Sequence, residues 1–202
     1  MRSLLFMLLI FVCAMSLSAQ HHHKGGALGA SEVSSEHSVY HLDAEWTSHR
    51  SETYSLSDFS GQPVIVVMFY GNCTQVCPIL IKDAWRLYSS IEKPMRDSLN
   101  VLAVTFDTEN DIPEVLRDYA EYEQLNIPGW HFITAEQANV RSLAMMLGVQ
   151  YTKKSDGHFA HTNLVTVLDK KGRIVKRVEG LSQPMDEAAE EIKSIMAKGK
   201  QQ

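Results

Sequence analysis

The stretch VIVVMFYGNCTQVCP, residues 64–78, joins an apolar run to two cysteines and a proline. Residues 64–70 form a short continuous apolar run, which is typical of a central strand covered on both faces of a sheet. Residues 75–92 then repeat apolar side chains at spacings of three and four, which predicts an amphipathic helix. Cys73 and Cys77 therefore lie just past a buried strand, at the start of a helix, where they could form a structural bridge, a redox pair or a metal site.

Strands and helices are predicted to alternate from this point to the C-terminus. Apolar runs predict further strands at residues 100–106, 130–134, 163–169 and 173–179. Helices are predicted to begin at DIPE (111–114), to span 136–147, and to begin at SQP (182–184). The KKG turn makes the last two strands a hairpin, and residues 152–160 are expected to form a polar loop.

The helical spacing also predicts which side chains face the core. They are Val76, Ile79, Leu80, Ala84, Leu87, Tyr88, Ile91, Val115, Leu116, Tyr119, Val140, Leu143, Ala144, Leu147, Met185, Ile192 and Ile195. Asp111 is expected to cap the helix that follows it, with Pro113 in the first turn. Gly148 is expected to end the helix that precedes it.

This order of elements defines an α/β domain. Strand, helix and strand, followed by helix, strand, strand and helix, gives a mixed sheet with helices on both faces, the thioredoxin-like arrangement. In such sheets reactive groups gather at the carboxyl ends of the parallel strands. Cys73 and Cys77 follow the first long strand directly and are expected at that edge.

The N-terminus has the pattern of an export signal. Arg2 precedes an almost unbroken apolar stretch at residues 4–15 that closes on small residues, so residues 1–19 are predicted to be a signal peptide cleaved near Ala19. A permanent membrane anchor needs about 18 or more apolar residues, which this stretch does not reach. The exported protein is therefore expected to meet a membrane only if the signal stays uncleaved.

A flexible tail, residues 20–37, and a single folded domain, residues 38–202, are predicted to follow the signal. The tail is rich in Gly, Ser, Ala and His without apolar periodicity. The full sequence has 45% hydrophobic residues, enough to bury one core, and its formal net charge of −5 makes nucleic acid a poor partner. Cys13 lies within the signal, which leaves Cys73 and Cys77 as the cysteines of the exported chain.

The chemistry of these two cysteines helps to distinguish a structural bridge, a redox pair and a metal site. A disulfide across so few residues closes little loop and would stabilise the fold little. If the helix starts near Thr74, the two Cα atoms lie about 6 Å apart, which a disulfide just spans. The helix N-terminus favours thiolates, so both sulfurs are expected to ionise more readily than a free cysteine. Paired thiolates select Cu(I), with zinc as the usual competitor, and a histidine is the third ligand sought.

Three histidines within the predicted core are candidates for that ligand. Six of the nine precede the core: His21, His22, His23, His37, His41 and His49. His131 lies beside Trp130 in a predicted strand and is expected to pack or to bond the backbone. His158 and His161 flank the loop that enters strand 163–169, and in thioredoxin-like folds this loop runs beside the cysteine helix.

Two features separate the chain from a plain thiol oxidoreductase. Thioredoxins place a cis-proline in that loop, whereas this chain reads AHTN at residues 160–163. The cysteine spacing is also one residue longer than the redox motif C-x-x-C.

The chain resembles the SCO/SenC family of copper chaperones for cytochrome c oxidase assembly, which are exported thioredoxin-like domains with a C-x-x-x-C-P motif and one distant histidine. The resemblance runs from residue 38 to the last helix. Its segments are SVYHLDAEWT (38–47), GQPVIVVMFYGNCTQVCP (61–78), VTFDTENDIPEVLRDYA (104–120), GWHFITA (129–135), LAMMLGV (143–149) and HTNLVTVLDKKGRI (161–174).

The resemblance implies that Cys73, Cys77 and His161 are the metal ligands. His161 is the histidine followed by threonine and, eight residues on, by the Asp of VLD, and His158 is the alternative. Asp107 matches an acidic residue that the family places near the copper site. Thr108 stands where the family usually has proline, so a role for Asp107 in bonding the loop amides is an equal alternative.

The function implied by the resemblance is a metallochaperone that binds copper, as Cu(I) or Cu(II), and delivers it to a copper enzyme, the cytochrome c oxidase copper centre. Its partners would be a copper-acceptor protein, such as an oxidase subunit, and a thiol redox partner, in the periplasm or another extracytoplasmic space. The alternative is a thiol-disulfide reductase acting on cysteines of the acceptor, with Cys73 attacking and Cys77 resolving. A peroxidase of the peroxiredoxin type is disfavoured, because both cysteines crowd one helix end.

The predicted tail adds a separate hypothesis. Cleavage after Ala19 would expose Gln20, His21 and His22, and a free amino terminus with an early histidine chelates Cu(II). A solvated histidine run is the alternative, and cyclisation of Gln20 would block the amine.

Overall fold

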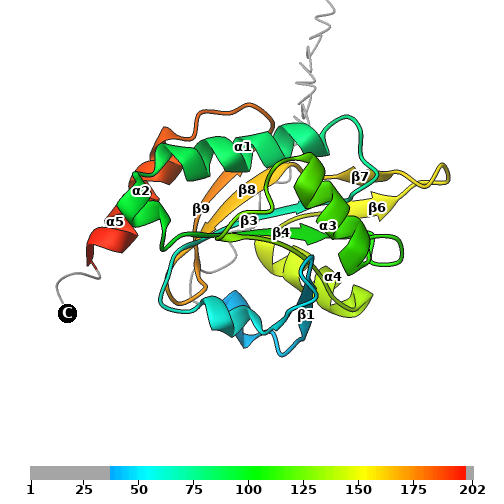
Figure 1. The fold of residues 1–202 in the computed structure, drawn as a ribbon, viewed down its shortest axis with the longest axis horizontal. Helices are drawn as coiled ribbons and strands as arrows, with labels where there is room; N and C mark the ends of the chain where they lie inside the picture. Colours follow the sequence, from blue (N-terminus) through cyan, green and yellow to red (C-terminus); the bar gives the residue numbers. More distant parts are fainter. Residues whose placement is uncertain (1–36, 199–202) are drawn as a thin grey trace, which may run out of the picture.

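The computed structural model describes residues 37–198, which form an α/β domain around a seven-stranded mixed sheet (Figure 1). The predicted signal at 1–19 and almost all of the predicted tail at 20–37 lie outside the described residues. Within residues 37–198 no helix is both long and apolar enough to cross a bilayer. The predicted α/β, thioredoxin-like fold class is confirmed.

The sheet has the strand order β2-β1-β5-β4-β3-β8-β9. Its parallel centre is β3 (Val64–Phe69), β4 (Asn100–Thr105) and β5 (Trp130–Thr134). The antiparallel strands are β8 (Leu164–Leu168), β9 (Ile174–Glu179), β1 (Trp46–Ser48) and β2 (Thr53–Tyr54). The five strands predicted from apolar runs are therefore confirmed, and the short strands β1 and β2 at one end of the sheet were not predicted.

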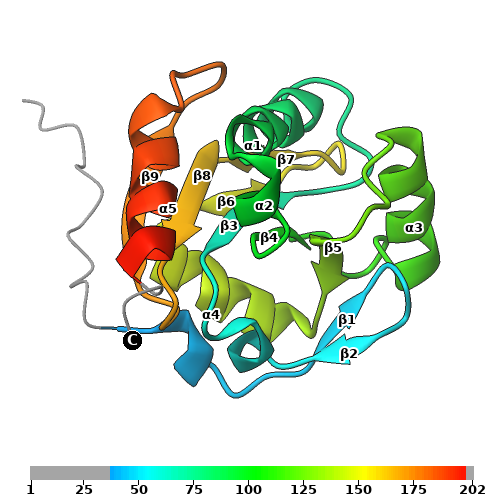
Figure 2. The ribbon, with the colours of Figure 1, turned by 60° about the vertical axis from the view of Figure 1, so that its left-hand side comes forward.

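Helices cover both faces of the sheet, as predicted. The α-helices are α1 (Cys77–Ser90), α2 (Lys93–Arg96), α3 (Pro113–Tyr122), α4 (Gln137–Leu147) and α5 (Asp186–Lys198), and two 3-10 helices are η1 (Val39–His41) and η2 (Leu56–Phe59). Figures 1 and 2 show α1 on one face of the sheet and α4 on the other, with α5 packed beside α1. Gly148 ends α4 with a left-handed φ of 81°, as predicted.

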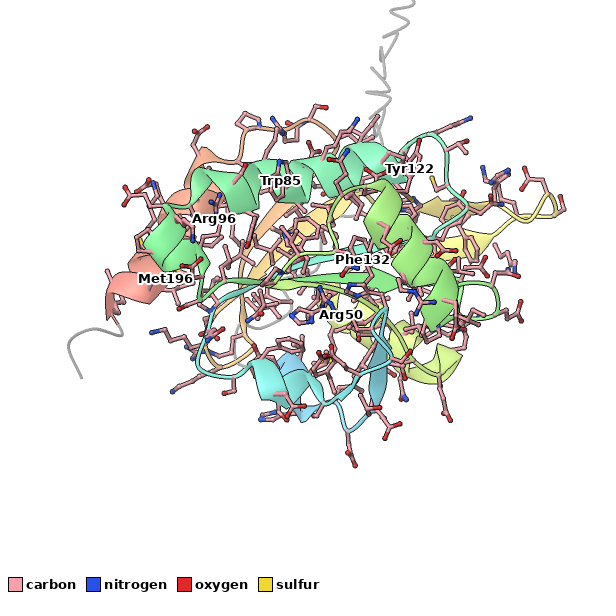
Figure 3. The ribbon with its side chains drawn as sticks, viewed as in Figure 1. Arg50, Trp85, Arg96, Tyr122, Phe132 and Met196 are labelled. Carbon is pink, nitrogen blue, oxygen red and sulfur yellow. The ribbon has the colours of Figure 1, made fainter. Side chains whose placement is uncertain are left out.

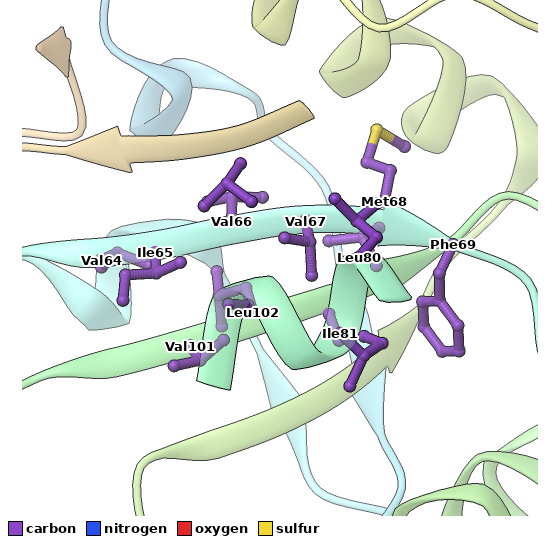
Figure 4. Packing of buried hydrophobic residues seen from close by; sticks show 14 of the residues in the cluster. Val64, Ile65, Val66, Val67, Met68, Phe69, Leu80, Ile81, Val101 and Leu102 are labelled. Carbon is purple, nitrogen blue, oxygen red and sulfur yellow. The ribbon is translucent and has the colours of Figure 1, made fainter. Parts of the chain in front are cut away.

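Strand β3 lies at the centre of the hydrophobic core and carries no polar side chain. All six residues of β3 are buried, because β4 and β8 pair with its two edges and helices cover its faces. Figure 4 shows Leu80 and Ile81 of α1 packed beside β3 and β4. Burial of this apolar surface fixes α1, and with it the two cysteines, against the carboxyl end of β3.

Three predictions for the helices are wrong in detail. Helix α1 begins at Cys77 and not near Thr74, so Cys73 precedes the helix. Ile79 is 39% exposed and Val115 is 40% exposed, although both were predicted to face the core. The buried stripe of α1 instead includes Leu80, Ile81 and Ala84, and Ile79 lies outside this stripe.

The predicted polar loop at 152–160 is part of a β-hairpin instead. Strands β6 (Tyr151–Lys153) and β7 (Phe159–His161) pair as a separate two-stranded sheet. Their side chains are half-buried or exposed, so the segment lacks the apolar pattern on which strand prediction depends. Figure 1 shows the β6–β7 hairpin at the end of the domain where α1 begins. His161 of the hairpin lies against Cys77, and His158 lies near Cys73.

Asp111 does not cap α3, contrary to the prediction. Ile112 is the N-cap of α3 and makes no side-chain cap bond. The buried Asp111 carboxylate instead accepts hydrogen bonds from the Gly71 amide, at 2.8 Å, and from the Thr105 hydroxyl. A Cβ atom at position 71 would lie 2.7 Å from Asp111 Oδ1, so this close approach requires glycine. Asp111 thus fixes the turn that leads from β3 to Cys73.

We expect Asp111→Ala to lower the free energy of unfolding by about 3 kcal/mol, because each buried donor that it leaves unpaired costs roughly 1–3 kcal/mol. The donors are the Gly71 amide and the Thr105 hydroxyl. Urea denaturation followed by circular dichroism measures the change. Asp97→Ala is the matched control, since Asp97 is exposed on the surface beside α2 and should change stability little. Equal effects of the two substitutions would show that Asp111 does not hold this turn.

Candidate functional site

The two cysteines lie at the junction of β3 and α1. Cys73 belongs to the turn after the strand, where its amide donates to the Tyr70 carbonyl, and Cys77 is the first residue of α1. Pro78 fits the first turn of the helix, where no amide donor is needed. The Cys77 amide donates to Cys73 Sγ at 3.3 Å. Both thiols are free, with Cys73 6% exposed and Cys77 fully buried.

The two thiols differ in their ease of ionisation. Burial raises the pKa of the Cys73 thiol, but hydrogen bonds from the Cys77 thiol and from backbone amides at the start of α1 outweigh it, and the pKa lies below its ordinary value. Burial, followed by the hydrogen bond to Cys73, raises the pKa of the Cys77 thiol far above its ordinary value. The prediction that both sulfurs ionise readily is therefore wrong for Cys77, because burial there exceeds the effect of the helix N-terminus.

His161 lies against Cys77. Its Nε2 atom is 3.6 Å from Cys77 Sγ, and its Nδ1 atom is 3.2 Å from the Thr162 carbonyl oxygen. Because a carbonyl only accepts, Nδ1 carries the hydrogen, which leaves the Nε2 lone pair directed at the thiol. Burial lowers the pKa of His161, although the hydrogen bond to Thr162 opposes it, so the ring is neutral near pH 7. A neutral imidazole with a fixed tautomer is suited to bind a metal.

The spacing of these atoms can be compared with a metal chelate. An ion with bonds of about 2.3 Å to sulfur and 2.0 Å to nitrogen holds the two atoms about 3.5 Å apart at a tetrahedral angle. The Cys77 Sγ to His161 Nε2 distance of 3.6 Å already matches that span. No three His, Cys, Asp or Glu side chains within residues 37–198 are arranged to hold an ion as they stand, so binding by both thiols and the imidazole requires a side-chain adjustment.

His158 lies beside Tyr70 and Cys73, and among the described residues it makes no hydrogen bond to Cys77. Its Nδ1 atom and the Tyr70 hydroxyl are joined by a hydrogen bond of 3.1 Å. Burial and a hydrogen bond with the Cys73 thiol raise the pKa of Tyr70 to about 12. A cavity of about 300 Å³ beside Cys73 is lined by Tyr70 and His158. Tyr70 was missed by sequence reasoning, because it appeared only as part of the apolar run.

Asp107 ties the hairpin to the loop after β4. Its carboxylate accepts from the Asn110 side chain at 2.8 Å and pairs with Lys153 of β6 at 3.4 Å. Lys153 also reaches Glu109 at 3.1 Å. These contacts fit the alternative in which Asp107 organises the loop, and they also anchor the hairpin that carries His161.

His131 packs within the fold, in agreement with the prediction. It lies in β5 with its ring edge-on to Tyr54 and Phe59, and its Nε2 atom is 3.3 Å from Asn100 Oδ1. Burial, followed by the charges of Arg50 and His49, lowers its pKa to about 4, while Glu52 opposes the shift. The ring is therefore held neutral in the folded protein.

The low pKa of His131 predicts a loss of stability in acid. Between its folded value of about 4 and its unfolded value of about 6.5, the unfolded chain binds the extra proton, so stability falls as the pH falls through this range. The shift corresponds to roughly 2–3 kcal/mol between pH 7 and pH 4. In His131→Phe this part of the pH dependence should vanish, as measured by urea denaturation at several pH values. Parallel curves for the two proteins would show that His131 ionises freely in the folded state.

Comparisons with known proteins assign the chain to a family. A family model described as SCO1/SenC matches residues 34–197. The SCO1 protein homolog of Bacillus subtilis (strain 168) is 23% identical over 144 residues, a match that spans 69% of this chain and 74% of that protein.

Two solved structures share the fold. ScoI of Arabidopsis thaliana, with copper bound, has a TM-score of 0.66 at 14% identity, covering 77% of this chain and 96% of that one. BsSco, described as having a disulfide switch and as a member of the Sco family of cytochrome c oxidase assembly proteins, has a TM-score of 0.66 at 21% identity, covering 76% of this chain and 91% of that one. Since the family model spans most of the sequence, from residue 34 to residue 197, this protein belongs to the SCO1/SenC family.

Proposed function

We propose that this protein is a copper chaperone that holds copper with Cys73, Cys77 and His161 and passes it to an acceptor protein. The observation that carries the proposal is the contact of His161 Nε2 with Cys77 Sγ at 3.6 Å, beside a second, hydrogen-bonded thiol. Soft thiolates favour Cu(I), and an added imidazole suits copper in either oxidation state. The copper bound in the related Arabidopsis protein supports copper over zinc as the metal.

The site combines a fully buried ligand, Cys77, with a ligand closer to solvent, Cys73. Cys77 is buried and its thiol must lose a proton to bind, which the positive charge of the metal favours. Cys73 lies at the surface end of the pair and lines open cavities. A ligand from another protein can therefore approach from the Cys73 side, and copper can leave by stepwise exchange of ligands. The binding site is proposed to release its copper in this direction.

The acceptor and the location follow from the family and the sequence. We infer that the acceptor is a copper enzyme, the copper centre of cytochrome c oxidase being the one that fits a family whose member BsSco is described as an assembly protein for that oxidase. The predicted signal at residues 1–19 supports action outside the cytoplasm, in the periplasm or an equivalent space. In this proposal residues 38–202 form the copper-binding domain.

A second function, thiol-disulfide reduction of the acceptor, is favoured by the unequal thiols. Cys73 has the lower pKa and the greater exposure, as an attacking thiol requires, and buried Cys77 is placed to resolve the mixed disulfide. Attack on an acceptor disulfide forms a Cys73 mixed disulfide and releases one acceptor thiol. Attack by Cys77 then releases the second and leaves a Cys73–Cys77 disulfide, so two electrons pass to the acceptor.

Anaerobic copper titration tests the chaperone. The fully reduced protein should bind one equivalent of Cu(I), the protein oxidised to the disulfide should bind none at this site, and Cys73→Ser should lose the site. Disulfide exchange is measured on the same samples with oxidised glutathione. If the reduced protein exchanges disulfides but binds no copper, the reductase function stands and the chaperone function is excluded.

A further inference from the structure

An open groove of about 850 Å³ lies beside Cys73, between the start of α1 and helix α3. Besides Cys73, we define this α3 groove by the four apolar or aromatic side chains that line it, Pro78, Val115, Tyr119 and Tyr122. Figure 3 labels Tyr122 near the cysteine end of α1. The groove thus brings solvent-accessible apolar surface to the more exposed of the two thiols.

Two of the apolar side chains that line the groove are exposed to solvent. Val115 is 40% exposed and Tyr122 is 82% exposed. An exposed apolar cluster rimmed by polar residues is typical of a surface that another molecule covers. Because the cluster borders Cys73, the covering molecule would lie within reach of the thiol.

The rim of the α3 groove is acidic. Asp118 and Glu123 line it, against a single lysine, Lys82, on the α1 side. Helix α3 also carries exposed Glu114 and Glu121 and half-buried Arg117, so carboxylates still outnumber cations around the groove. This excess of carboxylates favours a partner with basic side chains and speeds its approach at low salt.

We propose that the α3 groove binds an extended segment of the acceptor protein that carries a cysteine, an apolar side chain beside it, and a basic side chain. The cysteine would meet Cys73, the apolar side chain would pack on Val115 and Tyr122, and the basic side chain would pair with Asp118 or Glu123. This inference rests on the proposed function, because copper delivery and disulfide exchange both bring an acceptor sulfur to Cys73. It adds the chemical character of the segment that the protein recognises.

Two synthetic peptides test this recognition with the reduced protein. Each carries one cysteine as a mixed disulfide with thionitrobenzoate. In one peptide the neighbours are phenylalanine and arginine, and in the other they are serine and glutamate. The Cys73 thiolate attacks the peptide sulfur, and coloured thionitrobenzoate leaves. Cys77 then attacks Cys73, the peptide leaves as a thiol, and the two electrons of the protein dithiol have reduced the mixed disulfide.

We expect the phenylalanine–arginine peptide to react roughly tenfold faster at low salt, because it gains one apolar and one charged contact. The double variant Val115→Ser, Tyr122→Ser should lose the part of the rate difference that comes from the contact with phenylalanine. The variant Asp118→Lys should lose the part of the rate difference that comes from the charge of arginine. Met145→Ser, which alters an equally exposed apolar residue on α4, is the matched control and should keep the full preference.

Two further measurements separate the groove from the metal site. Each groove variant should bind one equivalent of Cu(I) and react with the small, uncharged disulfide of 2-mercaptoethanol at the normal rate, since neither probe extends into the groove. No preference in the unaltered protein, or a preference that survives both groove variants, would overturn the proposal. If the unaltered protein prefers the phenylalanine–arginine peptide but binds no copper, the chaperone function is overturned. The α3 groove then remains a docking surface for thiol exchange.

Discussion

Replacing His161 with alanine is expected to weaken Cu(I) binding by at least about a hundredfold, since changes in residues that merely support a ligand already cost 10–100-fold. His161 Nε2 is 3.6 Å from Cys77 Sγ and is held in the metal-binding tautomer by the Thr162 carbonyl. Its loss leaves a two-sulfur site and a small gap next to buried Cys77. Competition with a chromophoric Cu(I) chelator under anaerobic conditions measures the affinity.

His158→Ala is the matched control for His161→Ala. Both histidines belong to the β6–β7 segment, but His158 bonds the Tyr70 hydroxyl and makes no hydrogen bond to Cys77 in the described structure. We expect His158→Ala to change the copper affinity by less than about tenfold, as for a group outside the ligand set. Disulfide exchange with oxidised glutathione should survive in both variants, because both cysteines remain. If His158→Ala is the more damaging substitution, the ligand assignment is wrong.

The two single-cysteine proteins are expected to differ in reactivity by at least about a hundredfold, because thiolate fraction and exposure both favour Cys73. Cys77→Ser leaves Cys73, whose pKa is lowered and which lines two cavities. Cys73→Ser leaves Cys77, which is fully buried and whose pKa is raised by burial. Both proteins also carry Cys13→Ser, so that each has one thiol. Alkylation by iodoacetamide at pH 7, followed by mass spectrometry, gives the two rates.

Unfolding provides the control for this comparison. In concentrated urea both thiols lose their surroundings and should be alkylated at similar rates. Similar rates in the folded proteins as well would contradict the asymmetry of the site. The order of attack proposed for thiol exchange would then have no structural basis.

The fold could be predicted from the sequence where burial leaves a clear pattern. The continuous apolar run of β3 and the regular spacing in α4 gave the correct elements, and Gly148 marked the end of α4. The β6–β7 hairpin could not be predicted in this way, since it stands apart from the main sheet and buries neither face completely. The strands β1 and β2 are too short to show the alternation of apolar and polar side chains that predicts a strand.

Several features of the site depend on contacts between residues distant in sequence, which local sequence patterns do not predict. The sequence placed Cys73 and Cys77 at the end of a strand, and the family resemblance selected His161 over His158, but neither gave the contact between Tyr70 and Cys73. Asp111 has the local pattern of a helix cap, yet its partners come from residues distant in sequence, Gly71 and Thr105. The pKa of Cys77 depends on burial by the whole core, which a helix-dipole argument does not include.

The ligand set of the bound copper is the central claim, and X-ray absorption at the copper edge of the Cu(I)-loaded protein tests it most directly. We expect two sulfur neighbours and one imidazole nitrogen in the protein with Cys73, Cys77 and His161 intact. The nitrogen should disappear in His161→Ala and persist in His158→Ala. Copper bound by sulfur alone in the unaltered protein, or an imidazole signal that survives His161→Ala, would contradict the proposed site.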